Sequence, residues 1–341
     1  MQMSNLTFQD FLPQGEEITM LQTLVCSNKM PHALLITGEK GTGKRTLSQI
    51  LAASLLCINK GKRPCGICRN CTRAYTNEHP DMILIEKGTP LVASEAKKSK
   101  TTIPIDDIRE MIRLSSAHPF EGGNRIIQII NAEDMTTQAQ NCLLKILEEP
   151  PENTYFILTS SHPELLLQTI KSRCRFFKMK PWDEEQIIRI LVENGINKKK
   201  AYLATRACNG SIGYAKQLAD DENYWKMREE IITDFFINEK RSNILSVSSH
   251  WKENKTEIEQ LFSILEECIH IMLTFRITKK EDDRLNDFSN EWKYFAANAD
   301  PERFVILLDR ISECRKQCGF NVNIQAIVEQ LFLSLMGEIQ K

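Results

Sequence analysis

The sequence predicts an α/β N-terminal domain with a parallel sheet, followed by an all-α C-terminal half. Between residues 30 and 181, short apolar runs alternate with segments of helical spacing. Such alternation indicates a parallel sheet that helices cover on both faces, with right-handed connections. From residue 182 onward no run is convincing as a strand, and apolar residues recur three and four positions apart.

Each predicted element has a local signal. Strands are expected where apolar runs are short and bounded by turn residues, at 30–37, 82–86, 124–131, 155–161 and 175–181. Helical spacing predicts helices at 45–57, 103–119 and 163–174, and another that starts at 136. Pro150 and Pro151 should end the helix that starts at 136. The polar stretch 87–102 is expected to be a loop.

Chain length and breaks in the pattern predict the domain division. A chain of 341 residues exceeds what one hydrophobic core usually serves. We expect an α/β domain at 1–181, a small helical module at 182–218 and a helical bundle at 219–341. The apolar faces of its helices are expected mainly to form the core of the bundle.

Composition limits the function classes. The net charge of −1 argues against a protein that grips DNA by itself, so any DNA contact is expected to be shared with partners. The start of the chain lacks a basic and apolar leader, and no apolar run approaches the ~18 residues of a membrane span. We therefore expect a cytoplasmic protein with no membrane contact.

Four of the 11 cysteines form a metal-ligand pattern. Cys57, Cys65, Cys68 and Cys71 give the spacing C-x7-C-x2-C-x2-C, here called the cysteine knuckle (residues 57–71). Four sulfurs suit tetrahedral zinc, and four protein ligands leave no open position for catalysis. The prediction is a structural zinc site, with four free thiols or an iron–sulfur cluster as the alternatives.

The segment "GEKGTGKRT", residues 38–46, follows a predicted strand and precedes a predicted helix. Its glycines can aim backbone N–H groups at a phosphate, and its lysine can reach the terminal phosphates. The residues expected at a nucleotide are Gly38, Gly41, Gly43, Lys44 and Thr46. Arg45, however, stands where Ser or Thr normally ligates magnesium, and Thr46 comes one residue late. Magnesium binding is therefore not expected.

Several of these segments together resemble one family. They are "PHALLITGEKGTGK", "CGICRNC", "HPD" at 79–81, "NCLLKILEEPPENTYFILTSS" and "SRC" at 172–174. Over most of residues 25–215 the chain resembles the bacterial DNA polymerase III clamp-loader subunits of the AAA+ class, of delta-prime type. The resemblance implies a P-loop ATPase-like domain, a lid and a C-terminal collar. It also implies delta-type and gamma/tau-type sister subunits in a hetero-pentameric ring, which opens a sliding clamp and places it on primed DNA.

The chain departs from the hydrolysing members of that family. Their acidic pair at the end of the second strand falls on Ile130 and Asn131, while Glu133 and Asp134 lie further on. Gly213 replaces the arginine of their lid motif. Since phosphoryl transfer needs these parts, we expect no ATP hydrolysis by the chain alone. Two alternatives for the loop stay open: nucleotide binding without turnover, or an empty, vestigial loop.

Arg173 in "SRC" matches the family's arginine finger, which acts on a neighbouring subunit's ATP. The simpler alternative for a lone arginine is a surface pair with a carboxylate. For the whole chain, the competing hypotheses are an ATP-hydrolysing gamma/tau-type motor subunit of the same loader and a zinc-containing nucleic-acid-binding module.

Overall fold

A computed structural model of the chain describes residues 6–59, 61, 63–89, 91, 102–121, 123–208, 210–237, 243–253, 257–279, 283–318 and 323–339. The chain forms two compact units, Met1–Lys216 and Gln217–Lys341. The boundaries at 181 and 218 stay a prediction. Most of the loop expected at 87–102 lies outside the described residues.

The first unit is built on one five-stranded sheet in the order β2-β3-β4-β1-β5. Every strand pair is parallel, which confirms the predicted sheet. The strands are β1 (Ala33–Thr37), β2 (Met82–Ile85), β3 (Arg125–Ile129), β4 (Thr154–Ser160) and β5 (Arg175–Lys178). All residues of β1 and β3 are buried, as expected of strands covered on both faces, whereas the edge strand β5 is largely exposed.

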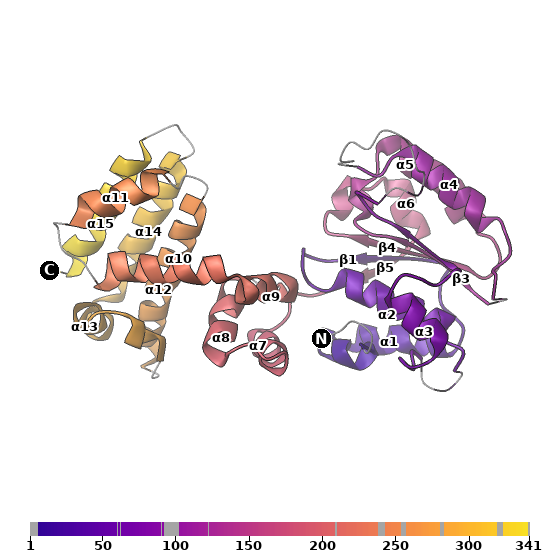
Figure 1. Cartoon of the computed structure of the whole chain (residues 1–341), viewed down its shortest axis with the longest axis horizontal. Coiled ribbons are helices and arrows are strands. Elements are labelled where there is room, and N and C mark those ends of the chain that lie inside the picture. Colours follow the sequence, from indigo (N-terminus) through magenta and orange to yellow (C-terminus); the bar gives the residue numbers. More distant parts are fainter. Residues whose placement is uncertain are drawn as a thin grey trace. The chain divides into compact units, whose positions relative to one another are not determined.

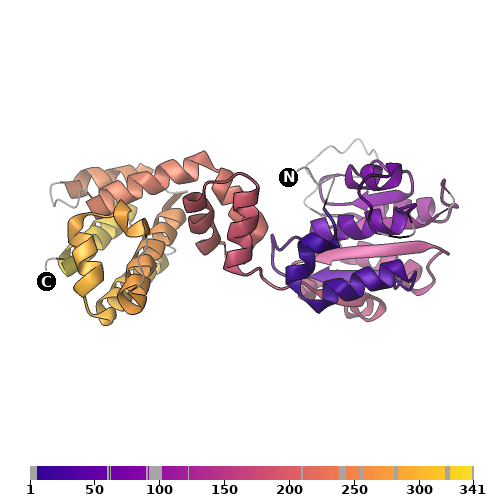
Figure 2. The same cartoon turned by 90° about the horizontal axis from the view of Figure 1, so that it is seen from below.

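Helices cover both faces of this sheet, α1 to α3 on one side and α4 to α6 on the other (Figure 1). Figure 2 shows the same layers from below. The helices are α1 (Glu16–Cys26), α2 (Lys44–Leu56), α3 (Arg69–Tyr75), α4 (Ile105–Ser115), α5 (Thr137–Glu148) and α6 (Gln168–Arg173). Short 3-10 turns lie at Phe8–Gln14, Ala132–Asp134 and Pro163–Leu165.

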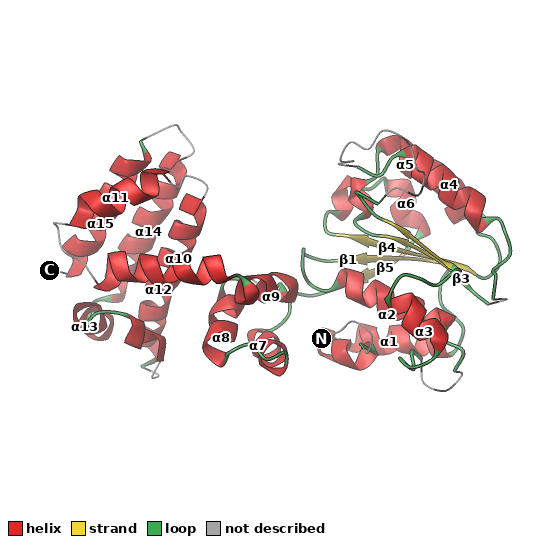
Figure 3. Ribbon diagram, viewed as in Figure 1, coloured by secondary structure: helices red, strands yellow, loops and turns green. Residues whose placement is uncertain are grey.

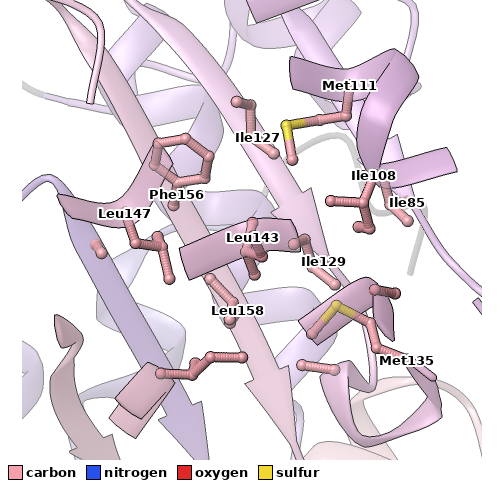
Figure 4. Close-up of a cluster of buried hydrophobic side chains, with 14 of the residues drawn as sticks. Ile85, Ile108, Met111, Ile127, Ile129, Met135, Leu143, Leu147, Phe156 and Leu158 are labelled. Carbon is pink, nitrogen blue, oxygen red and sulfur yellow. The ribbon is translucent and has the colours of Figure 1, made fainter. Parts of the chain in front are cut away.

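Helix α5 begins and ends where the sequence predicts. Its cap residue Thr136 accepts a hydrogen bond from the Ala139 N–H at 3.2 Å, and it stops two residues before Pro150. Its apolar face packs with α4 and α6 on the sheet, where Leu143, Phe156 and their neighbours form a buried cluster (Figure 4). This cluster fixes the C-terminal ends of α5 and α6, which carry residues of the candidate site.

Three short helices complete the first unit and lead into the second: α7 (Glu184–Glu193), α8 (Lys198–Arg206) and α9 (Ile212–Asp220). We call residues 182–216 the lid segment. Trp182, at its start, is buried and packs its ring edge-on against Phe11 at 5.7 Å between centroids. The lid segment therefore packs on the α/β part of the same unit.

The described elements of the second unit are all helical, as predicted (Figure 3). Its α-helices are α10 (Glu222–Ile232), α11 (Ile244–Glu253), α12 (Ile258–Thr278), α13 (Asn290–Asn298), α14 (Pro301–Cys318) and α15 (Ile324–Ile339). A π-helical turn at Thr233–Ile237 and a 3-10 turn at Asp283–Asp287 join them. Their stripes bury large side chains, among them Trp251, Phe262, Trp292 and Phe304. Among the described helices of the whole chain, none combines the length and the apolar character of a membrane span.

Candidate functional site

The phosphate loop lies between β1 and α2, at the carboxyl edge of the sheet. Gly41 and Gly43 adopt φ of +81° and +100°, a left-handed conformation that glycine takes at little cost. Gly43 directly precedes the first turn of α2, whose N-terminus carries the positive end of the helix dipole. The sequence therefore forms the turn that a phosphate-binding loop requires.

Lys44 is buried and held by the loop itself. Its Nζ donates to the carbonyl oxygens of Gly38 at 2.7 Å and Glu39 at 2.6 Å. Burial lowers the pKa of the Lys44 ammonium, and the nearby carboxylates of Glu133 and Glu39 partly offset that effect. A phosphate at this loop would have to compete with both carbonyls for the ammonium.

A pocket of about 610 Å³ opens beside the loop. Gly41, Gly43, Lys44 and Thr46 line it, whereas Gly38, also predicted at a nucleotide, is not among its lining residues. One carboxylate, that of Asp10, and five cationic side chains line it: Lys40, Lys44, Arg45, Arg189 and Lys216. Such a concentration of positive charge suits an anionic ligand.

Arg45, in the slot of the magnesium-ligating hydroxyl, pairs with a carboxylate that follows β2. Both guanidinium Nη atoms contact Glu86, and the Nη2 to Oε1 distance is 3.2 Å. The sequence alone does not identify Glu86 as this partner. Its place after a strand of a parallel sheet was the available signal, because ligands and loops gather at the carboxyl ends of such strands.

The end of β3 shows what stands in place of the acidic pair. Ile130 is buried, and the N–H of Asn131 donates to Thr159 Oγ1 at 3.0 Å. Glu133, one short turn further on, accepts from the N–H of Ser161 at 2.8 Å. Its charge acts on Lys44, so the structure brings a carboxylate closer to the loop than the spacing suggested.

The lid segment contacts the phosphate loop directly. The Gly213 N–H donates to the Gly41 carbonyl at 2.8 Å, and the indole N–H of Trp182 donates to the Thr42 carbonyl at 2.8 Å. A Cβ at Gly213 would lie 3.2 Å from the Cα and the oxygen of Gly41. The residue that replaces the lid arginine is therefore also one that allows the two backbones to approach.

The four knuckle cysteines converge. The Sγ atoms of Cys57, Cys65, Cys68 and Cys71 all lie within 4.8 Å of one another, and those of Cys65 and Cys71 are 3.9 Å apart. Zinc–sulfur bonds of about 2.3 Å at tetrahedral angles separate sulfurs by about 3.8 Å. The donor set and its spacing therefore fit one tetrahedral metal ion.

A buried ion pair fixes the loop beside the knuckle. Asp81 Oδ1 lies 3.3 Å from Arg125 Nη2, and its two oxygens accept from the N–H groups of Phe120 at 2.7 Å and Glu121 at 3.0 Å. Glu121 in turn pairs with Arg73 of α3 at 2.9 Å. "HPD" thus ties α3 and the loop before β3 to the sheet.

Arg173 is the last residue of α6, and its side chain is 31% exposed. Its Nη1 donates to the Thr169 carbonyl at 2.9 Å, and its Nη2 contacts a carboxylate oxygen of Glu148. Within this chain the arginine is thus paired with a carboxylate, a partner whose type, but not its position, the sequence predicts.

The strand order with β1 between β4 and β5, the glycine loop at the end of β1 and the lid segment packed on it define a P-loop unit of the AAA+ class. Residues 13–183 match the family described as DNA polymerase III, delta subunit, and residues 222–336 match the family described as DNA polymerase III, delta subunit, C terminal. The chain belongs to the DNA polymerase III delta-subunit family, as a subunit of delta-prime type.

Individual relatives agree with this membership. The chain is 26% identical over 333 residues to DNA polymerase III subunit delta' of Bacillus subtilis, covering 94% of this chain and 96% of that protein. It is 35% identical over 202 residues to the delta' subunit of Escherichia coli, covering 59% and 58%. To the tau subunit of Escherichia coli it is 32% identical over 222 residues, covering 63% of this chain and 32% of that one.

Proposed function

We propose that the chain is a non-hydrolysing subunit of a clamp loader, which helps hold a ring of delta-type and gamma/tau-type sister subunits together while the ring loads a sliding clamp on primed DNA. The observation that carries the proposal is the Arg45–Glu86 pair. A guanidinium occupies the slot of the magnesium ligand, so a metal ion there would face a fixed positive charge. The C-terminal helices, on this proposal, form the collar.

Hydrolysis needs more than the metal ligand. The strand-end positions carry Ile130 and Asn131, and the lid position carries Gly213. Metal, water and charge stabilisation act together in phosphoryl transfer, so the loss of several parts removes turnover. Steady-state ATP hydrolysis by the isolated chain, with magnesium and primed DNA, tests this. Brisk turnover would instead support a motor subunit of gamma/tau type.

Arg173 is the residue that we propose acts in trans, as an arginine finger toward the ATP of a neighbouring subunit. A guanidinium stabilises charge on the transferring phosphoryl group and can change the rate by several orders of magnitude. Its place at the exposed end of α6 supports the proposal. In the reconstituted loader, Arg173→Ala should lower ATP turnover strongly, and an unchanged rate would refute the finger role.

The pocket beside the loop supports nucleotide binding without turnover. Its volume of about 610 Å³ and its five cations suit a nucleoside polyphosphate that comes without magnesium. Titration calorimetry with ATP in excess EDTA should then show binding that added magnesium does not strengthen. Binding that requires magnesium would refute this form of the site, and no binding at all would support the vestigial loop.

For the knuckle we propose one structural zinc ion. All four thiolates would be ligands, and the metal would order the segment between α2 and α3. Elemental analysis of the purified chain should give one zinc per chain, and Cys71→Ser should lower that ratio. Iron in place of zinc would indicate a cluster instead. The nucleic-acid-binding alternative predicts tight DNA binding by the isolated chain, which its net charge of −1 does not favour.

A further inference from the structure

Glu148 and Arg173 end two neighbouring helices. Glu148 is the last residue of α5, Arg173 is the last residue of α6, and their side chains are in contact. The Glu148 side chain is 49% exposed, so the pair lies at the surface. A surface pair by itself is weak evidence of a role, but both residues of this pair extend from a firmly packed backbone.

Buried neighbours fix both backbones. Leu147 precedes Glu148 and is 1% exposed, while Cys174 follows Arg173 and is 8% exposed. Both belong to the buried cluster on the sheet, together with Ile170 of α6. The two side chains therefore extend from positions that packing holds, and their contact orients the arginine relative to the sheet.

The contacts leave part of the guanidinium open to a ligand. A guanidinium carries five N–H donors in a fixed plane. In Arg173, Nη1 donates to the Thr169 carbonyl and to the Ser172 hydroxyl at 3.5 Å. Its Nη2 contacts the Glu148 carboxylate. The Nε–H has no partner among the residues that the structure describes. The arginine is thus oriented while keeping a donor for a phosphoryl oxygen.

We propose that Glu148 is a positioning residue, which holds the Arg173 guanidinium in the orientation that reaches a neighbouring subunit's ATP. This inference rests on the proposed finger role of Arg173. A long arginine side chain loses rotamer freedom when it binds, and a partner that restrains it beforehand removes part of that loss. Glu148 does not touch the nucleotide on this proposal, and it acts only through Arg173.

The test is a double-mutant cycle in the reconstituted loader, with kcat and KM for ATP measured in the presence of clamp and primed DNA. Glu148→Ala should lower kcat by about tenfold, as the loss of a supporting partner does, and leave KM for ATP unchanged. Glu148→Gln keeps an oxygen that can accept from Nη2, so it should recover part of the rate. In an Arg173→Ala chain, Glu148→Ala should have no further effect.

Glu149→Ala is the matched control, since Glu149 is the adjacent exposed glutamate and its side chain bonds no described residue. It should leave kcat unchanged. If Arg173→Ala leaves the rate unchanged, the finger role itself is wrong. If Arg173→Ala lowers the rate and Glu148→Ala does not, only the positioning role is wrong. An equal loss from Glu148→Ala in both backgrounds would indicate a merely structural role. A higher rate in Glu148→Ala would overturn the proposal, because Glu148 would then hold the arginine away from the phosphoryl group.

Discussion

Substitution of Gly41 by alanine tests whether the lid segment packs directly against the phosphate loop. An added Cβ would lie 2.0 Å from the Ser211 hydroxyl oxygen and 3.3 Å from the Tyr214 nitrogen. Ser211 is buried, and its hydroxyl accepts from the Tyr214 N–H at 3.2 Å at the start of α9. The added Cβ therefore displaces the hydroxyl at the cost of that bond, or moves the first turn of α9.

Two contributions set the magnitude. A non-glycine residue at the φ of +81° costs roughly 1–2 kcal/mol, and loss of a helix-capping hydroxyl bond costs about 1 kcal/mol. The sum, about 2–3 kcal/mol, corresponds to a roughly 30- to 150-fold larger population of the open lid. Hydrogen exchange followed by mass spectrometry measures it, because the Gly213 N–H is bonded to the Gly41 carbonyl.

Gly195→Ala is the matched control. Gly195 has a φ of +87°, but nothing lies within 4 Å of an added Cβ, so only the backbone strain of roughly 1–2 kcal/mol applies. Exchange at Gly213 should therefore accelerate more in Gly41→Ala than in Gly195→Ala. Removal of the hydroxyl with Ser211→Ala should reduce the additional cost of Gly41→Ala. Equal exchange in the two alanine variants would refute the contact that we assign to the lid.

Three further predictions concern the sheet and the loop. Asp81→Ala leaves the buried Arg125 without its carboxylate and should lower the free energy of unfolding by about 3–5 kcal/mol, seen as faster amide exchange in β3. Glu110→Ala, which breaks an exposed pair, should have a far smaller effect. Burial lowers the pKa of His79 in the folded chain, so as pH falls the unfolded chain binds a proton at this histidine before the folded chain does. The free energy of unfolding should therefore fall as pH drops below about 6.5, and His79→Gln should reduce this pH dependence. Arg45→Thr alone should not produce ATP hydrolysis, as a steady-state assay would show.

The sequence predicts best what is local along the chain. The strands, α5 and the convergence of four cysteines within 15 residues follow from periodicity, proline positions and short spacing. The partners of the charged site residues could not be predicted in the same way. Glu86 meets Arg45 and Glu148 meets Arg173 across 41 and 25 residues, and the packing of whole helices and strands decides which exposed carboxylate comes within reach.

Glu133 shows the same limit and bears on mechanism. Counting along the chain put it beyond the strand-end positions, yet the turn at Ala132–Asp134 brings its charge to bear on Lys44. One of its oxygens accepts from the Ser161 N–H, which binds it to the end of β4. A carboxylate at this place offsets part of the cost of burying the Lys44 ammonium.

On the proposed non-hydrolysing role, the charges around the loop predict that no single substitution produces ATP turnover. Arg45 meets the carboxylate of Glu86, and Lys44 meets the field of Glu133 and the loop carbonyls. A threonine at position 45 would supply a hydroxyl for magnesium but would also release Glu86 from its partner. The end of β3 would still offer Ile130 and Asn131, neither of which can hold the metal as an anion. Arg45 thus has a carboxylate partner, and Lys44 is bonded to backbone carbonyls beside the charge of Glu133, which supports the proposed role without turnover.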